Sequence, residues 1–313
     1  MHFAYPPRKS SNPPPFRSRS IKVPMLRRPR LKPIAIGALL FLGALYLLFG
    51  GKRPDPYHEH VPSGYPSVVL LTVNDPSTSD RAYLDTIREN REKYAAKHGY
   101  ETMIVNAQDY DVRDLPRSWA KVFAMRHALS KFPDCKFVWY LDQDAYIMNP
   151  SLSLEDQVVN SRRLESVMIR DYPVVPPDSI IKTFSHLQGE NIDFIVSQDR
   201  EGLQHKSIII RNGEWAKFFI ETWFDPMYRS YNFQKAERHA LEHIVQWHPT
   251  VLSKLALVPQ RVLGSYSQAS LGEEFQEGDF VVLFAGCTDT GEHSCQAESS
   301  RYLEKMKQNY NKL

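Results

Sequence analysis

The chain has 313 residues, of which 42% are hydrophobic and 24% are charged, as expected of a folded protein. Its formal net charge of +3 hides an asymmetry, because residues 1–53 hold eleven Lys or Arg and no acidic residue. The rest of the chain carries 28 basic and 36 acidic residues. The positive charge therefore belongs to the tail, and the composition gives no support to a nucleic-acid partner.

The N-terminal region predicts a membrane anchor. Residues 1–33 are rich in proline and arginine, which predicts a disordered cytosolic tail. Residues 34–51 are uncharged and would rise about 27 Å as a helix, near the lower limit for spanning a bilayer. Basic residues concentrate before this segment, so the positive-inside rule places the N-terminus in the cytosol and residues 54–313 in the lumen, as expected of an uncleaved signal anchor. A cleaved signal peptide is the alternative, but no small-x-small cleavage site is evident. We therefore expect a stem over 52–65 and a single lumenal domain over 66–313.

The following elements alternate between strand and helix. The expected strands lie over 67–73, 101–105 and 136–141, and the expected helices over 80–98 and 118–130. This order is typical of an α/β fold with a parallel sheet, whose ligands bind at the carboxyl ends of the strands. The second half is more mixed, with strands expected over 193–196, 207–211, 255–259 and 279–285, and helices over 213–223 and 235–247.

The three cysteines predict one local disulfide. Cys287 and Cys295 are eight residues apart, a spacing that permits a bridge in a lumenal domain. Cys135 is then a buried thiol, and a cysteine-based zinc site is not expected. We also expect most of the five tryptophans to lie in the core, with one or two lining an acceptor cleft. The residues are Trp119, Trp139, Trp215, Trp223 and Trp247.

Two carboxylates, Asp142 and Asp144, follow the apolar strand expected over 136–141. At this spacing they can converge on one hard cation such as Mg²⁺ or Mn²⁺, which keeps coordination positions for phosphate oxygens. The metal would bridge the diphosphate of a nucleotide sugar and stabilise it as a leaving group. The competing interpretation is an exposed acidic turn, since the tripeptide is common by chance.

The segment FVWYLDQDAYIMNPSL resembles the signature of glycosyltransferase family 34, the galactosyl/mannosyl/xylosyltransferase family. The blocks over 223–231 and 240–248 look most similar to the fungal α-1,6-mannosyltransferase subunits of the mannan polymerase II complex. Together the similar segments span about residues 67–290. Further matching positions are Asn90-Arg91, Tyr94-Ala95, His98–Tyr100, Trp119, Lys121, Ser197–Asp199, Ile210–Asn212, Trp215, Trp223 and Phe284–Cys287.

The resemblance implies a Rossmann-like GT-A-type fold and a retaining, metal-dependent transfer of mannose from GDP-mannose to the mannan of N-glycans. It implies a Golgi membrane protein that acts with other mannosyltransferase subunits. Asp142 and Asp144 match the metal ligands, and Lys121 and Asp199 match further donor-binding positions. Glu237, with the two aspartates, matches a catalytic position. Ordinary surface charges are the alternative interpretation of Lys121 and Glu237. No dedicated general base is expected.

Several departures from the family pattern bear on activity. Many relatives carry His where this chain has Leu283, and often Gln where it has Arg238. A small, Gly-containing turn is replaced by residues 204–206. His293 could substitute for the missing ligand, although a solvent-exposed loop histidine is the alternative. Two further hypotheses therefore stand beside the active mannosyltransferase: a non-catalytic subunit of a mannosyltransferase complex, and an α-galactosyltransferase that uses UDP-galactose.

Overall fold

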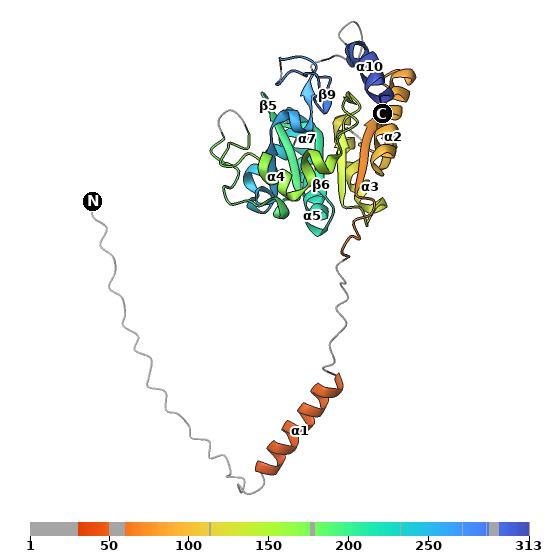
Figure 1. Ribbon diagram of the computed structural model, residues 1–313. Coiled ribbons are helices and arrows are strands. Elements are labelled where there is room, and N and C mark those ends of the chain that lie inside the picture. Colours follow the sequence, from red (N-terminus) through yellow and green to blue (C-terminus); the bar gives the residue numbers. More distant parts are fainter. Residues whose placement is uncertain are drawn as a thin grey trace, which may run out of the picture. The chain divides into compact units, whose positions relative to one another are not determined.

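Figure 1 shows the computed structural model of the chain, which divides into two units, residues 1–58 and 59–313. In the first unit, helix α1 covers Leu31–Phe49. Among the described residues, no helix has both the length and the apolarity needed to cross a membrane. The anchor over 34–51 thus stays a prediction, and most of the expected tail and stem lie outside the described part. The structure describes residues 31–49, 60–112, 114–175, 179–231, 233–270, 272–285, 287 and 294–312.

A six-stranded sheet forms the centre of the second unit, in the order β2-β1-β3-β6-β5-β7. Strand β1 pairs in parallel with β2 and β3, which confirms the alternating pattern of the first half. Strand β6 runs antiparallel to both β3 and β5, whereas β5 and β7 are parallel. The sheet is therefore mixed. The strands are Val68–Asn74 (β1), Glu101–Asn106 (β2), Phe137–Leu141 (β3), Phe194–Asp199 (β5), Gly202–Arg211 (β6) and Leu255–Val258 (β7).

Helices cover both faces of this sheet, so its central strands are buried throughout. Alternate residues serve opposite faces: Val69 and Leu71 enter one core cluster, whereas Val68 and Leu70 enter another. The first cluster packs against α3, α5 and α7, and the second against α2 and α4. These helices are Arg81–His98 (α2), Ala120–Lys131 (α3), Ser161–Val167 (α4), Glu214–Trp223 (α5) and Ala236–Trp247 (α7).

A three-stranded sheet, in the order β4-β9-β8, lies beyond the end of β3. Strand β4 is antiparallel to β9, and β8 is parallel to β9. The C-terminal helix α10, which the sequence did not predict, packs with Met306 in a third core cluster. These elements are Ala145–Ile147 (β4), Ser265–Tyr266 (β8), Val281–Leu283 (β9) and Cys295–Asn311 (α10). The short helices are Pro226–Ser230 (α6), Pro249–Leu252 (α8) and Gln260–Leu263 (α9).

The predicted disulfide and the predicted buried thiol are confirmed. Cys287 and Cys295 form a disulfide, and Cys135 is a buried free thiol. Three tryptophans, Trp119, Trp139 and Trp223, are buried as expected. Trp247 instead exposes 70% of its surface.

Candidate active site

The predicted aspartates lie in the short loop that joins β3 to β4. The Asp142 amide donates to the Lys206 carbonyl of β6 at 2.8 Å. The Phe284 amide, directly after β9, donates to the Asp144 carbonyl at 2.8 Å. Both sheets therefore hold the loop through its backbone, and the two carboxylates occupy the carboxyl end of β3, where the sequence pattern placed them.

Gln143, the residue between the aspartates, attaches the loop to the end of β1. Its Oε1 accepts from the Asp75 amide at 2.7 Å, and its Nε2 donates to Ser79 Oγ at 3.3 Å. No role for this side chain was predicted from the sequence. These contacts connect the carboxyl ends of β1 and β3 at the site.

Arg91 of α2 holds the same loop through its backbone carbonyls. Its Nη2 donates to the carbonyls of Asp142 and Ala145 at 2.9 and 3.0 Å, and its Nε donates to Thr72 Oγ1 at 3.2 Å. Burial lowers the pKa of Arg91 to about 10, so the guanidinium stays charged at neutral pH. Arg91 matches the family pattern in sequence without a predicted role, and its hydrogen bonds in the structure position the loop.

All four carboxylate oxygens of the two aspartates face donors of the protein. Tyr140 donates to Asp142 Oδ2 at 3.0 Å, and the Asp144 amide donates to Asp142 Oδ1 at 3.1 Å. Tyr83 donates to Asp144 Oδ1 at 3.3 Å, and Lys206 Nζ lies 3.6 Å from Asp144 Oδ2. Three of these oxygens thus accept hydrogen bonds within the protein, and Asp144 Oδ2 has the ammonium of Lys206 as its neighbour.

Lys206 stands between the two carboxylates. Its Nζ is 3.9 Å from Asp142 Oδ1 and donates to the Phe284 carbonyl at 2.7 Å. The side chain retains 19% exposure, and each aspartate retains 17%. The sequence predicted a turn over 204–206 before a strand over 207–211, but the structure places all of these residues, including Lys206, inside β6. The position of this lysine could not be inferred without the antiparallel pairing of β6 with β3.

Lys206 stabilises the charged forms of both aspartates, whereas the two aspartates repel each other. Burial acts to raise the pKa of Asp142, but the ammonium groups of Lys206 and Lys121 outweigh it and hold that pKa below its ordinary value. Burial raises the pKa of Asp144 to about 6, with Lys206 opposing the rise and Asp142 adding to it. Burial lowers the pKa of Lys206, but the two carboxylates outweigh it and raise that pKa above its ordinary value.

These residues do not fit the Mg²⁺ or Mn²⁺ that the sequence predicts. Such cations prefer several oxygen ligands, whereas here a lysine ammonium occupies the space between the carboxylates. Leu283, buried and paired with Ala145, adds no ligand. Within the described part of the chain, no group of three or more His, Cys, Asp or Glu could hold a metal. His293 lies outside that part, so its predicted substitution stays a prediction.

Lys121 and Glu237 form a second, closed cluster with His205. Lys121 Nζ lies 2.9 Å from Glu237 Oε1 and 2.8 Å from His205 Nδ1. The lysine and glutamate side chains expose only 4% and 1%. Burial acts to raise the pKa of Glu237, but Lys121 and His205 outweigh it and hold the pKa far below its usual range. The structure therefore pairs two residues for which separate roles were predicted, and their predicted roles in donor binding and catalysis stay predictions.

Asp199 lies in a third group, paired with a cation of α7. Arg238 Nη2 donates to Asp199 Oδ1 at 2.5 Å, and Tyr266 donates to Asp199 Oδ2 at 2.7 Å. The same guanidinium contacts Glu242 of α7 at 3.3 Å through its Nε. Arg238, noted in the sequence as a departure from the family, is thus the direct counter-ion of a predicted donor-binding residue, whose role stays a prediction.

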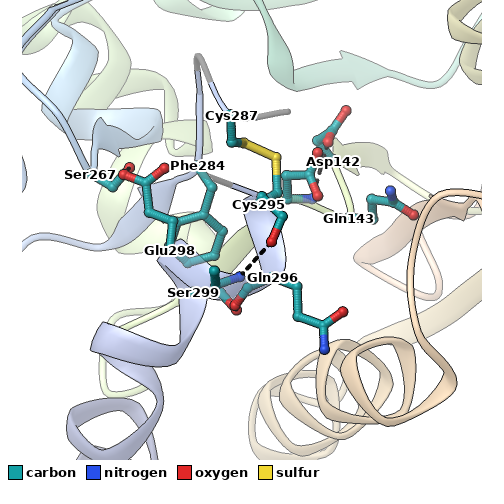
Figure 2. The surroundings of a disulfide bond; sticks show 12 residues. Asp142, Gln143, Ser267, Phe284, Cys287, Cys295, Gln296, Glu298 and Ser299 are labelled. Atoms are coloured by element: carbon teal, nitrogen blue, oxygen red, sulfur yellow. Dashed lines mark hydrogen bonds between the residues drawn. A yellow bond between two sulfur atoms is a disulfide. The ribbon is translucent and has the colours of Figure 1, made fainter. Parts of the chain in front are cut away.

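The disulfide lies beside the aspartate loop. Figure 2 shows Asp142 and Gln143 among the residues that surround the Cys287–Cys295 bond. Glu298, in the first turn of α10, accepts from Ser267 Oγ at 2.6 Å, and its charge further raises the pKa of Lys206. The bridge therefore fixes the C-terminal segment at the edge of the candidate site.

The fold is that of a glycosyltransferase. It matches the crystal structure of a glycosyltransferase involved in the glycosylation of the major capsid of PBCV-1, with a TM-score of 0.51. The match covers 77% of this chain and 98% of that one. The two sequences are only 12% identical, so this likeness concerns the fold alone.

The chain belongs to the galactosyl transferase GMA12/MNN10 family, whose sequence profile matches residues 64–294. An uncharacterized α-1,2-galactosyltransferase of Schizosaccharomyces pombe is 32% identical over 77% of this chain and 75% of its own length. The α-1,2-galactosyltransferase of the same yeast is 30% identical, over 68% and 59%. The probable α-1,6-mannosyltransferase MNN11 of Saccharomyces cerevisiae is 30% identical, over 77% and 62%. The last two alignments span less than two thirds of those relatives. The match to the family profile confirms the family resemblance predicted from the sequence.

Proposed function

We propose that this glycosyltransferase moves a hexose from a nucleoside-diphosphate sugar to a glycan hydroxyl at the loop that carries Asp142 and Asp144. The observation that carries the proposal is the Lys206 ammonium between two partly exposed carboxylates at the carboxyl end of β3. The ammonium suits a diphosphate, and the carboxylates suit the hydroxyls of ribose or sugar, from which they accept strong hydrogen bonds. A GT-A-type assignment of the fold is part of the same proposal.

The proposed reaction retains the configuration at the anomeric carbon. The bond between that carbon and the donor phosphate oxygen breaks, and a bond from the acceptor oxygen forms on the same face. The acceptor proton passes to the leaving phosphate oxygen, so no protein base is required. The chain's residues position the donor and stabilise the charge that develops on the leaving diphosphate.

GDP-mannose is the first candidate donor, for α-1,6-linked mannan on N-glycans. Its support is the similarity of the blocks over 223–231 and 240–248 to fungal α-1,6-mannosyltransferase subunits, together with MNN11 and the 29% identical MNN10. With this donor we propose a Golgi setting and assembly with other mannosyltransferase subunits. The Cys287–Cys295 disulfide favours the oxidising interior of the secretory pathway.

UDP-galactose is the second candidate donor. The observation that favours it is the similarity to three proteins of Schizosaccharomyces pombe, 30–33% identical, which are named α-1,2-galactosyltransferases. A non-catalytic subunit is the remaining alternative, motivated by Leu283 and by the internal pairing of the carboxylates.

An assay of the purified full chain with GDP-mannose and UDP-galactose, on α-mannoside acceptors, tests the proposal. We expect turnover with one donor. Asp144→Asn should reduce it at least about 100-fold, because a charge at the reacting centre is lost. The matched control is Asp85→Asn on the exposed side of α2, which should leave turnover unchanged. Full activity of the Asp144→Asn variant, or no turnover with or without partner subunits, would contradict the proposal.

A further inference from the structure

We propose that the Lys206 ammonium supplies the positive charge that holds the donor diphosphate, so that nucleoside-diphosphate binding needs no divalent cation. This inference rests on the proposed function and replaces the metal that the sequence predicts. It concerns a residue to which neither the sequence motifs nor the family match gives a role.

The Lys206 ammonium lies among three oxygen groups of the protein. Lys206 Nζ lies 3.6 Å from Asp144 Oδ2 and 3.9 Å from Asp142 Oδ1, and it donates to the Phe284 carbonyl at 2.7 Å. Two carboxylates and a carbonyl from separate segments thus converge on one cation. The hydrogen bond to the carbonyl fixes the end of an otherwise flexible side chain.

The Lys206 ammonium has more hydrogen-bond donors than the Phe284 carbonyl uses. A lysine ammonium has three N–H donors, and the Phe284 carbonyl uses one of them. Both carboxylate distances exceed the length of a direct hydrogen bond. Donors therefore remain for phosphate oxygens, and the side chain as a whole keeps 19% exposure.

The Lys206 ammonium would compete with a metal ion for the two carboxylates. A divalent cation bound by both aspartates would lie against the ammonium, and like charges at that distance repel strongly. Asp142 Oδ2 and Asp144 Oδ1 also each accept a hydrogen bond already, from Tyr140 and Tyr83, which leaves fewer lone pairs for a metal. The carboxylates hold the lysine in place of a metal, and the lysine faces the diphosphate.

Calorimetric titration of the full chain with GDP and with UDP, in EDTA and in Mn²⁺, tests the inference. The Kd of the bound nucleotide should agree within about twofold between the two buffers, and Lys206→Met should raise it at least about tenfold in EDTA. Lys217→Met, an exposed lysine of α5, is the control and should change nothing. Nucleotide binding that requires Mn²⁺ overturns the inference while leaving the proposed function intact. The comparison of the wild-type nucleotide Kd in EDTA and in Mn²⁺ remains a test even if a variant fails to fold.

Titration with Mn²⁺ alone gives a readout that does not depend on the nucleotide. The wild-type chain should bind Mn²⁺ at least about tenfold more weakly than Lys206→Met, whose carboxylates lose their internal cation. Equal affinity in the two proteins, or wild-type Mn²⁺ binding that His293→Ala abolishes, overturns the inference. If neither nucleotide binds in any buffer, the proposed function fails, and the diphosphate role of Lys206 fails with it.

Discussion

Two lysine clusters lie side by side in this molecule and differ in how far they are closed. Lys121 and Glu237 are 2.9 Å apart and expose 4% and 1% of their side chains. Lys206 and Asp144 are 3.6 Å apart and expose 19% and 17%. Tyr140 connects the clusters, because its hydroxyl donates to Asp142 while its ring lies 5.4 Å from Lys121 Nζ.

The alternation of side chains along β6 explains why the two lysine clusters are separate. His205 and Lys206 are neighbours in the strand, yet the histidine joins Glu237 and the lysine joins the aspartates, as expected when successive side chains point to opposite faces. The closed cluster has direct contacts between all of its charges, so it suits a structural role. The open cluster keeps exposed, incompletely used donors, so it suits a ligand.

The largest expected effect comes from breaking the closed pair. Glu237→Gln leaves Lys121 buried without its counter-ion and should lower the free energy of unfolding by about 3–5 kcal/mol. The double variant with Lys121→Met should recover part of this loss, because no charge is then stranded. Urea unfolding measures both. A loss below about 0.5 kcal/mol in the single variant, as is usual for a surface change, would contradict the structural role.

A smaller effect on stability is expected from breaking the open cluster. Lys206→Met should lower the free energy of unfolding by about 1–2 kcal/mol, since solvent can still reach the two aspartates. The same urea titration compares it directly with Glu237→Gln. If Lys206→Met proves the more destabilising of the two, the contrast between a structural and a ligand-binding lysine is wrong.

The smallest effect is on the pH dependence of stability. Burial, with Lys121, lowers the pKa of His205 below its ordinary 6.5, and the pKa of Glu237 lies below 4.5 because Lys121 and His205 outweigh its burial. Both groups bind more protons in the unfolded chain, so stability should fall as pH drops below 6.5, and further below 4.5. Asp144, with its pKa raised to about 6, acts in the opposite direction between about pH 4 and 6.

Glu237→Gln isolates the closed cluster in this profile. Urea unfolding at a series of pH values should show a flatter decline below pH 4.5 in the variant than in the wild type, because one titrating carboxylate is gone. Parallel profiles for the two proteins would show that Glu237 is not held ionised by Lys121.

Local patterns carried the sequence predictions that are confirmed. The apolar runs predicted β1 and β3, Gly99 marked the end of α2 and adopts a left-handed φ of 70°, and the short spacing of Cys287 and Cys295 predicted the disulfide. The position of Asp142 at the end of a buried strand also follows from sequence order alone.

Long-range pairing decided what the sequence did not reveal. Lys206 meets the aspartates only because β6 turns antiparallel beside β3, and Lys121 meets Glu237 across 116 positions of sequence. Helix α10 has a polar average composition and was missed because tertiary packing at Met306 stabilises it. A family motif identifies the carboxylates but not the cation that accompanies them.

A structure of the full chain with bound GDP or UDP, determined with and without Mn²⁺, tests the central claim most directly. We predict phosphate oxygens within hydrogen-bonding distance of Lys206 Nζ in both complexes, with the Lys121–Glu237 pair unchanged. A diphosphate bound to Lys121, or bound through Mn²⁺ on Asp142 and Asp144 with Lys206 displaced, would contradict it.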